Sequence, residues 1–234
     1  MGRGNFFNGK SAFLLNVKMI MMVIAIGLAV TSYKKDKDDK GNNGVVPGTD
    51  TEKSVLINGV RWATHNMDMP GTSAAKPEDV GMLYQWNRKV GWSNANPMIN
   101  SNGGTTWDTS FTDGDTWEKV NDPSPADYRV PTKKELESLA NTMYVTHVWT
   151  NINGIYGYRC TDKATGASLF LPAVGYRYGS SGLLNSVGSF GYYWSSTPYL
   201  TTNAYYLIFY SNNFYVYHNN NRTYCFSIHC VAAN

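Results

Sequence analysis

The chain has 234 residues, of which 42% are apolar and 16% charged. This length and composition suit one domain with a full hydrophobic core behind a leader. The net charge of +3 comes from scattered basic residues, which excludes nucleic acid as an expected partner. The 22 Gly, 17 Tyr and 7 Trp favour a loop-rich α+β domain built mainly from short strands.

Residues 1–32 are predicted to be a signal peptide. Three basic residues, Arg3, Lys10 and Lys18, precede an apolar run over residues 19–30, which is too short to span a bilayer. Residues 33–53 are rich in Lys, Asp, Gly and Asn and are predicted to be a disordered linker. We therefore expect an exported protein whose folded domain covers residues 54–232.

The segment over residues 32–40 resembles the stretch after the lipid-modified Cys of Bacteroidetes surface lipoproteins. Tyr33 stands at the position of that Cys. Because Tyr cannot carry the thioether-linked lipid, either the anchor is lost or the leader is removed by ordinary cleavage. The sequence thus predicts a location at the cell surface, on the outer membrane or outside the cell.

The first half of the domain contains two strong local signals. Residues 55–63 predict a β-hairpin around an Asn58-Gly59 turn. Thr132 and Glu135 form a capping box at the start of a helix that runs to about residue 140, with Leu136 and Leu139 on its apolar face. Between these signals we expect a polar connection, a short strand or turn, and a long loop anchored by two tryptophans: residues 64–81, residues 82–92, and residues 93–127 with Trp107 and Trp117.

The second half predicts further strands over residues 145–149, 154–159, 168–173 and 191–197. Residues 205–210 alternate, so one face of a strand should enter the core and the other should point outward. We assign Tyr205, Leu207 and Phe209 to the core face, and Tyr206, Ile208 and Tyr210 to the outward face. A loop rich in Asn should follow, and then a strand segment on which Phe226, Ile228 and Cys230 share one face.

The last forty residues, from Ser195, have a composition of their own. They contain no Lys, Glu, Gln, Met or Trp, although about eight would be expected in an average chain. They contain seven Tyr, three Phe and seven Asn, and Arg222 carries their only formal charge. Every residue type in them can be encoded by a codon that ends in a pyrimidine, which is what random replacement of the adenines of Asn codons produces. This composition is typical of a hypervariable binding surface.

Five separated blocks resemble the Fibrobacter succinogenes major paralogous domain family. The blocks are residues 57–63, 81–87, 128–132, 169–173 and 193–197, and the resemblance covers roughly residues 54–232. It implies a C-type-lectin-like fold related to the formylglycine-generating enzymes. The tail also resembles the variable region of proteins that a diversity-generating retroelement rewrites by adenine-specific mutagenesis.

The resemblance implies that ligand-facing positions lie in a variable region over about residues 195–229. A protein or a glycan is the implied ligand. The implied positions are Tyr199, Leu200, Thr201, Tyr206, Ile208, Tyr210, Phe214, Tyr217, His218, Thr223 and Tyr224. One departure is Ser124, where the family often has a Cys, so that a bridge from this position to the C-terminal strand would be missing.

Two alternatives remain beside the binding hypothesis. A structural module of a pilus or another surface assembly would explain the leader but not the tail. A copper oxidoreductase like the formylglycine-generating enzymes would use Cys225 and Cys230, which have the spacing of the copper-holding pair. Cys230 belongs to the final strand, however, whereas the enzymatic pair precedes that strand. The pair is also unlikely to bridge, whereas Cys160 could pair with one of the two.

No motif in the sequence predicts catalysis, a metal or another cofactor. The four His residues lack partners at metal-ligand spacing. The run from Asp113 to Asp115 fits a polar turn better than a calcium loop, because the remaining acidic ligands are missing. We therefore expect a binding protein and not an enzyme.

Overall fold

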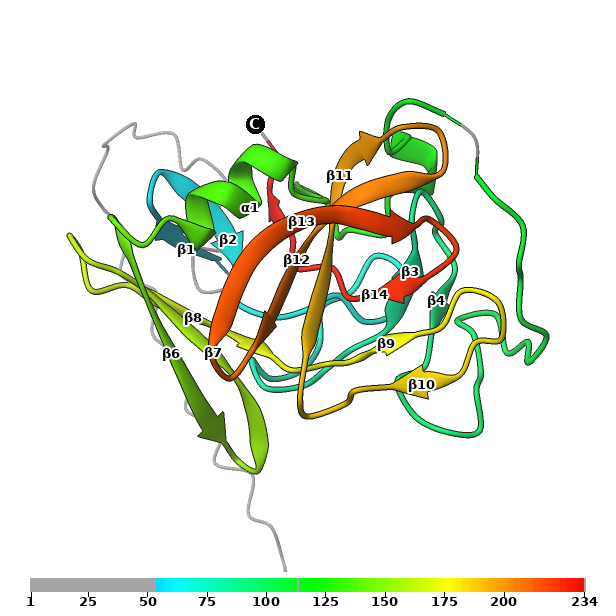
Figure 1. Cartoon of the computed structure of the whole chain (residues 1–234), viewed down its shortest axis with the longest axis horizontal. Coiled ribbons are helices and arrows are strands. Elements are labelled where there is room, and N and C mark those ends of the chain that lie inside the picture. The colour runs from blue at the N-terminus through cyan, green and yellow to red at the C-terminus, as the bar shows by residue number, and fades with distance from the viewer. Residues whose placement is uncertain (1–53, 113, 234) are drawn as a thin grey trace, which may run out of the picture. The chain divides into compact units, whose positions relative to one another are not determined.

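Four small sheets, mostly antiparallel, and one α-helix make up the described part of the chain (Figure 1). The computed structural model describes residues 54–112 and 114–233, without the side chains of His218 and Asn219. The predicted signal peptide and linker, residues 1–53, lie outside the described residues. The folded part is a loop-rich α+β structure dominated by strands, as expected. None of its helices is long and apolar enough to cross a membrane.

The first sheet joins the two ends of the domain. Its order is β1 (Ser54–Ile57), β2 (Val60–Ala63), β15 (Val231–Ala232) and β5 (Tyr128–Arg129). Asn58 and Gly59 turn the β1–β2 hairpin with φ values of 44° and 79°, the positive values that a type I′ turn requires. Val231 pairs with Trp62, so the N-terminal hairpin and the C-terminal strand are neighbours. The hairpin and its turn confirm the sequence prediction.

Helix α1 (Lys133–Ala140) begins where the capping box predicts. The Thr132 hydroxyl accepts the Glu135 N–H at 3.3 Å, and the Glu135 carboxylate accepts the Thr132 N–H at 2.7 Å. Such a cap stabilises a helix by about 1 kcal/mol. Arg129 holds the same carboxylate in a two-pronged ion pair at 2.6 and 2.8 Å. Leu136 and Leu139 are buried, which confirms the predicted apolar face.

Two further sheets contain three and five strands. One consists of β6 (Val145–Ile152), β7 (Ile155–Asp162) and β8 (Ser168–Pro172). The other has the order β10 (Leu184–Asn185), β9 (Tyr176–Arg177), β14 (Cys225–Phe226), β3 (Leu83–Gln85) and β4 (Gly91–Trp92). The strands expected over residues 145–149, 154–159 and 168–173 are therefore present, and the short strand or turn expected over residues 82–92 contains β3 and β4.

The long connection over residues 93–127 contains one short 3-10 helix, η2 (Lys119–Asn121), as its only described helix or strand. The two tryptophans expected to anchor it do so. The Trp107 ring lies 4.9 Å from the ring of Trp92, and the Trp117 ring lies 5.6 Å from that of Trp86. These contacts attach an irregular segment to the core.

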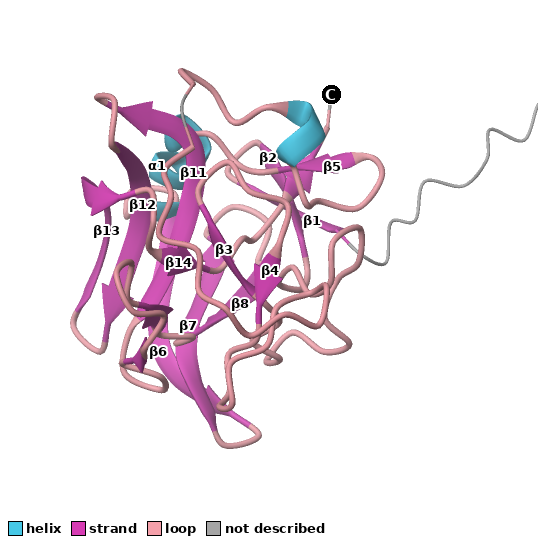
Figure 2. Cartoon of the chain, turned by 90° about the vertical axis from the view of Figure 1, so that its right-hand side faces the viewer, coloured by secondary structure: helices cyan, strands magenta, loops and turns pink. Residues whose placement is uncertain are grey.

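The remaining sheet consists of β11 (Gly191–Tyr199), β12 (Asn203–Tyr210) and β13 (Asn213–Asn221), with β12 in the middle (Figures 1 and 2). The sequence predicts an Asn-rich loop where β13 lies, and that prediction is wrong. Asn is depleted in strands, but pairing with β12 along most of its length overrides this local preference. The segment also supplies Phe214 and Val216 to the core.

Both faces of β12 are covered, by two different groups of side chains. The helix-side cluster includes Leu207 and Phe209 and packs against α1 and the β6–β7–β8 sheet; the aromatic-side cluster includes Trp194, Phe226, Ile228 and Cys230. Phe226, Ile228 and Cys230 thus share one cluster, although the strand expected to carry them ends at Phe226. Tyr206 and Ile208 also belong to the aromatic-side cluster and are only 4% and 9% exposed. The expectation that they point into solvent is wrong, because this face is covered as well.

Candidate ligand-binding surface

A continuous layer of aromatic side chains covers the aromatic-side cluster, and we call it the aromatic surface. Its members come from β9, β11, β12 and β13 and from the segments next to β9, β11 and β14. Three of them are clearly exposed: Tyr178 at 43% and Tyr215 and Tyr217 at 40% each. The others are half-buried: Tyr176, Phe190, Tyr192, Tyr210 and Tyr224.

Ring contacts connect the surface from one side to the other. Starting from the segment after β9, the chain of contacts includes Tyr178–Tyr224 at 5.1 Å, Tyr224–Tyr176 at 5.8 Å, Tyr176–Tyr192 at 4.8 Å, Tyr192–Phe190 at 6.1 Å and Phe190–Tyr210 at 4.9 Å. On β13, the Tyr217 ring lies 6.0 Å from that of Tyr215. Three of these pairs, Tyr178–Tyr224, Tyr176–Tyr192 and Tyr215–Tyr217, are edge-to-face, and such a pair adds about 1 kcal/mol beyond burial. The surface is therefore one packed unit.

Two of the residues predicted to bind ligand form the floor of this unit. Ile208 pairs with Tyr192 on one side and with Tyr215 on the other. Tyr206 contacts the rings of Phe226 at 5.1 Å and Tyr217 at 6.1 Å. The exposed tyrosines thus stand on buried residues, which limits their freedom to move.

The aromatic surface contains no Asp, Glu, Lys or Arg side chain. Burial and the nearby hydroxyls of Tyr176 and Tyr215 raise the pKa of Tyr192 to about 12. Burial, a hydrogen bond with Tyr178 and further tyrosine hydroxyls raise the pKa of Tyr224 to about 12. The surface therefore offers apolar rings together with neutral hydroxyls that can both donate and accept hydrogen bonds.

The residues predicted to bind ligand fall into several places. Tyr210, Tyr217 and Tyr224 belong to the aromatic surface. Thr223 is 9% exposed, and its hydroxyl donates to Asn221, so its expected outward position is wrong. Phe214 enters the opposite, helix-side cluster, where it stacks on His147 at 4.3 Å. It is therefore not a ligand-facing residue of this surface.

A second group lies at the other end of β12. Tyr199, Leu200 and Thr201 lead into the β11–β12 turn, and Leu200 is 74% exposed. The 8 residues of β12 separate this turn from Tyr210, a distance of roughly 25 Å at the rise of a strand. The predicted set therefore does not form one patch. The side chain of His218 lies outside the described part of the structure.

Sequence reasoning missed Tyr215 and all members of the surface that precede residue 195. Tyr215 could have been found, because residues 215 and 217 share the parity of one strand face whereas residues 214 and 217 do not. For Tyr176, Tyr178, Phe190 and Tyr192 no local signal exists. They join the surface only because β9 and β11 fold next to β14 and β12.

The single charge of the tail is structural. The Arg222 guanidinium is buried and donates to the carbonyls of Leu200 at 2.9 Å and Gly114 at 2.8 Å. It also lies over the Trp86 ring, with its central carbon 4.1 Å from the ring centroid. Arg222 therefore ties the β11–β12 turn to the long connection, and it is not a binding residue of the aromatic surface.

All three cysteines are buried free thiols. Cys225 packs in the helix-side cluster and Cys230 in the aromatic-side cluster. Burial raises the pKa of both thiols above the usual range. The Ser124 hydroxyl lies 3.2 Å from the Cys230 sulfur. The position at which the resembled family often has Cys is thus adjacent to Cys230.

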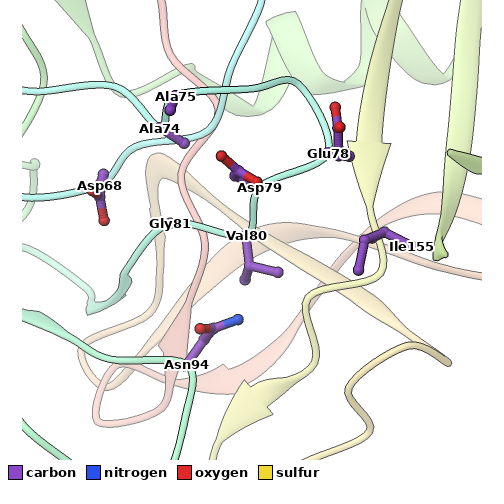
Figure 3. A pocket seen from close by; sticks show the side chains of 9 residues that line it. All are labelled: Asp68, Ala74, Ala75, Glu78, Asp79, Val80, Gly81, Asn94 and Ile155. Atoms are coloured by element: carbon purple, nitrogen blue, oxygen red, sulfur yellow. The ribbon is translucent and has the colours of Figure 1, made fainter. Parts of the chain in front are cut away.

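A separate pocket of about 450 Å³ shares no residue with the aromatic surface. It is lined by Asp68, Ala74, Ala75, Glu78, Asp79, Val80, Gly81, Asn94 and Ile155 (Figure 3). Its acidic groups support the local loop: Glu78 accepts a hydrogen bond from Asn153 at 2.7 Å, which lowers the Glu78 pKa. Asp79 accepts the Lys76 N–H at 3.1 Å. No nucleophilic Ser, Cys or Lys is among the lining residues.

No three His, Cys, Asp or Glu side chains in residues 54–112 and 114–233 gather as a metal site would require. Asp113, the first residue of the acidic turn considered for calcium, lies outside the described residues. The carbonyl of the adjacent Gly114 accepts a hydrogen bond from the Arg222 guanidinium.

Comparison with known families gives one match. A family model described as a domain of unknown function (DUF8237) matches residues 158–231. This segment runs from within β7 to β15 and includes every member of the aromatic surface. No curated protein and no solved structure matches the chain.

Proposed function

We propose that this protein is an exported binding protein that holds a protein or glycan ligand on the aromatic surface and performs no chemistry on it. The observation that carries the proposal is the exposure of Tyr178, Tyr215 and Tyr217 above a fully packed floor. Contiguous exposed apolar area of this kind costs solubility unless a partner covers it.

The residue types favour recognition of a macromolecule. Tyrosine supplies a large contact area, and only two side-chain torsions have to be fixed on binding. The floor formed by Tyr206, Ile208 and Phe226 lowers this cost further, because it already restricts the rings above it. The aromatic surface contains no charged side chain, so affinity should come from stacking and hydroxyl hydrogen bonds.

We further propose that the scaffold is C-type-lectin-like and that a retroelement diversifies its tail. The restricted composition of residues 195–234 and the resemblance of five sequence blocks support this. Diversification would act at exposed positions such as Tyr215, Tyr217 and Leu200, because replacement of the buried Tyr206 or Ile208 would disturb the core. A near-identical repeat with adenines at these codons, beside a reverse transcriptase gene, is the expected genomic arrangement. Its absence would contradict diversification but not binding.

The test of binding is a double substitution on β13. Tyr215→Ser with Tyr217→Ser removes two exposed rings, and Tyr144→Ser serves as the control because Tyr144 is 52% exposed and lies outside the surface. The purified domain and both variants are applied to a glycan array and to a display library of linear peptides. We expect the double variant to lose at least about tenfold in affinity for the probes that wild type selects.

Circular dichroism and urea unfolding of the same samples separate binding from folding. If both variants keep the wild-type fold and the double variant still binds the selected probes as wild type does, the aromatic surface is not the binding site. If wild type selects nothing from either collection, the binding proposal fails.

A further inference from the structure

The outer edge of β13 is an unprotected sheet edge beside the aromatic surface. β13 pairs with β12 and with no other described strand. In Figure 2 it lies at the left margin of the sheet. Its sequence contains neither Lys nor Pro, the residues by which natural edge strands usually prevent pairing.

The hairpin geometry identifies the backbone groups that face outward. Tyr210 pairs with Asn213 across a two-residue turn, and such a flanking pair exchanges hydrogen bonds. Asn213, Tyr215 and Tyr217 therefore direct their backbone groups to β12, whereas Phe214 and Val216 direct theirs away. Within residues 54–112 and 114–233, no backbone hydrogen bond to Phe214 or Val216 is formed from outside the β12–β13 pair.

The side chains fix this edge in place. Phe214 and Val216 pack against the helix-side cluster, and the Phe214 ring stacks at 5.4 Å on that of Phe209. On the other face, Tyr215 and Tyr217 are each 40% exposed. An incoming strand would therefore find rigid donors and acceptors at its edge and exposed rings beside it.

We propose that β13 receives an extended segment of a partner polypeptide as a fourth strand of the β11–β12–β13 sheet. This inference rests on the proposed function, because the partner would lay alternate side chains against Tyr215 and Tyr217. A polypeptide is favoured over a glycan because an extended chain repeats its N–H and C=O groups on one side every second residue, about 7 Å apart, as β13 does. The absence of formal charge on β13 favours a segment of uncharged, β-branched or aromatic residues.

The test uses a proline that removes one outward donor. Because the Val216 N–H faces away from β12, Val216→Pro should leave the β12–β13 ladder intact, as prolines on edge strands do. Val216→Ala is the matched control, since it trims the side chain and keeps the N–H. Peptides are selected from a display library of linear sequences on the wild-type domain. The selected peptides are also synthesised with N-methyl groups at alternate residues.

We expect the selected peptides to lose about tenfold in affinity for Val216→Pro, and less than about threefold for Val216→Ala. N-methylation of one alternate set of residues, but not of the other, should produce a similar loss. Urea unfolding of both variants identifies any loss of affinity that comes from unfolding.

Three results would overturn the inference. If the selected peptides need Tyr215 and Tyr217 but tolerate Val216→Pro, the aromatic surface binds ligand but the β13 edge does not. If the domain selects glycans and no peptide, the edge is likewise not the binding site. A dimer in sedimentation velocity that Val216→Pro dissociates would show that a second copy of the chain occupies the edge.

Discussion

Tyr206 and Leu207 are neighbours on β12, and both are buried, yet their side chains enter different clusters. Leu207 packs with α1 on one face of the sheet, and Tyr206 packs with Phe226 and Tyr192 on the other. β12 is therefore an interior strand, and a different hydrophobic cluster packs against each of its two faces. The layer that we propose to face the ligand therefore lies further outward, in the residues that cover β12.

This arrangement predicts unequal effects along the tail. Tyr206→Ala should destabilise the fold by about 3–5 kcal/mol, because it leaves a cavity under the aromatic surface. Tyr215→Ala should cost about 0.5 kcal/mol or less, since the ring is 40% exposed. Urea unfolding of the two variants checks the difference, and equal losses would contradict the assignment of floor and surface.

Ser124→Cys should form a disulfide with Cys230. The Ser124 oxygen lies 3.2 Å from the Cys230 sulfur, so a small adjustment brings two sulfurs to bonding distance. The bridge would close a long loop and stabilise the oxidised protein by about 3 kcal/mol. Thiol alkylation and mass spectrometry should count two free Cys in the oxidised variant, Cys160 and Cys225, instead of the four of the reduced variant. Ser124→Ala is the control, and a variant that keeps all its thiols after oxidation would refute the geometry.

Arg222→Met should destabilise the protein by about 3 kcal/mol. The substitution removes a buried guanidinium and its partly buried hydrogen bonds to the carbonyls of Leu200 and Gly114. Arg88→Met is the comparison, because Arg88 forms a partly exposed ion pair with Asp108 and should cost about 1 kcal/mol or less. Thermal unfolding measures both, and limited proteolysis should cut first near residue 114 in the Arg222 variant. Equal melting temperatures for the two variants would contradict the role of Arg222 in tying the β11–β12 turn to the long connection.

Stability should fall as the pH drops from about 6.5 to about 4, because of His229. Burial lowers the pKa of this imidazole to about 4 in the folded protein, from 6.5 in an unfolded chain. In this window the unfolded state binds a proton that the folded state does not, so acid favours unfolding. Over this pH range the free energy of unfolding should fall by about 3 kcal/mol.

The pH effect can be assigned by substitution. His147 has a lowered pKa, again mainly from burial, and acts in the same direction, so His147→Gln and His229→Gln are compared. The pKa values of Glu135 and Asp162 are lowered, and these carboxylates lose their contribution only below their usual range near 4. Unfolding free energies between pH 4 and 7 should depend least on pH in His229→Gln. A slope unchanged from wild type would remove His229 as the cause.

The sequence by itself determined the features whose physics is local. Asn58-Gly59 dictates its turn because both residues tolerate positive φ, and Thr132 with Glu135 starts α1 because the two caps satisfy each other. The alternation of β12 correctly separated Leu207 from Tyr206. The unusual composition of the tail also predicted that the candidate binding surface includes the part of the chain that holds Tyr215 and Tyr217.

Only the tertiary structure decided that both faces of β12 are covered and that neither meets solvent. An alternating sequence pattern shows that successive side chains point to opposite faces of a strand. It does not show whether one face or both faces of the sheet are covered. Phe226 and Tyr192 cover Tyr206 and Ile208 because β11 pairs with β12 and Ser227, next to β14, bridges to Tyr193 of β11. The same long-range pairing turned an Asn-rich segment into β13 and brought Tyr176 and Tyr178 to the surface, since burial and strand partners come from residues distant in the chain.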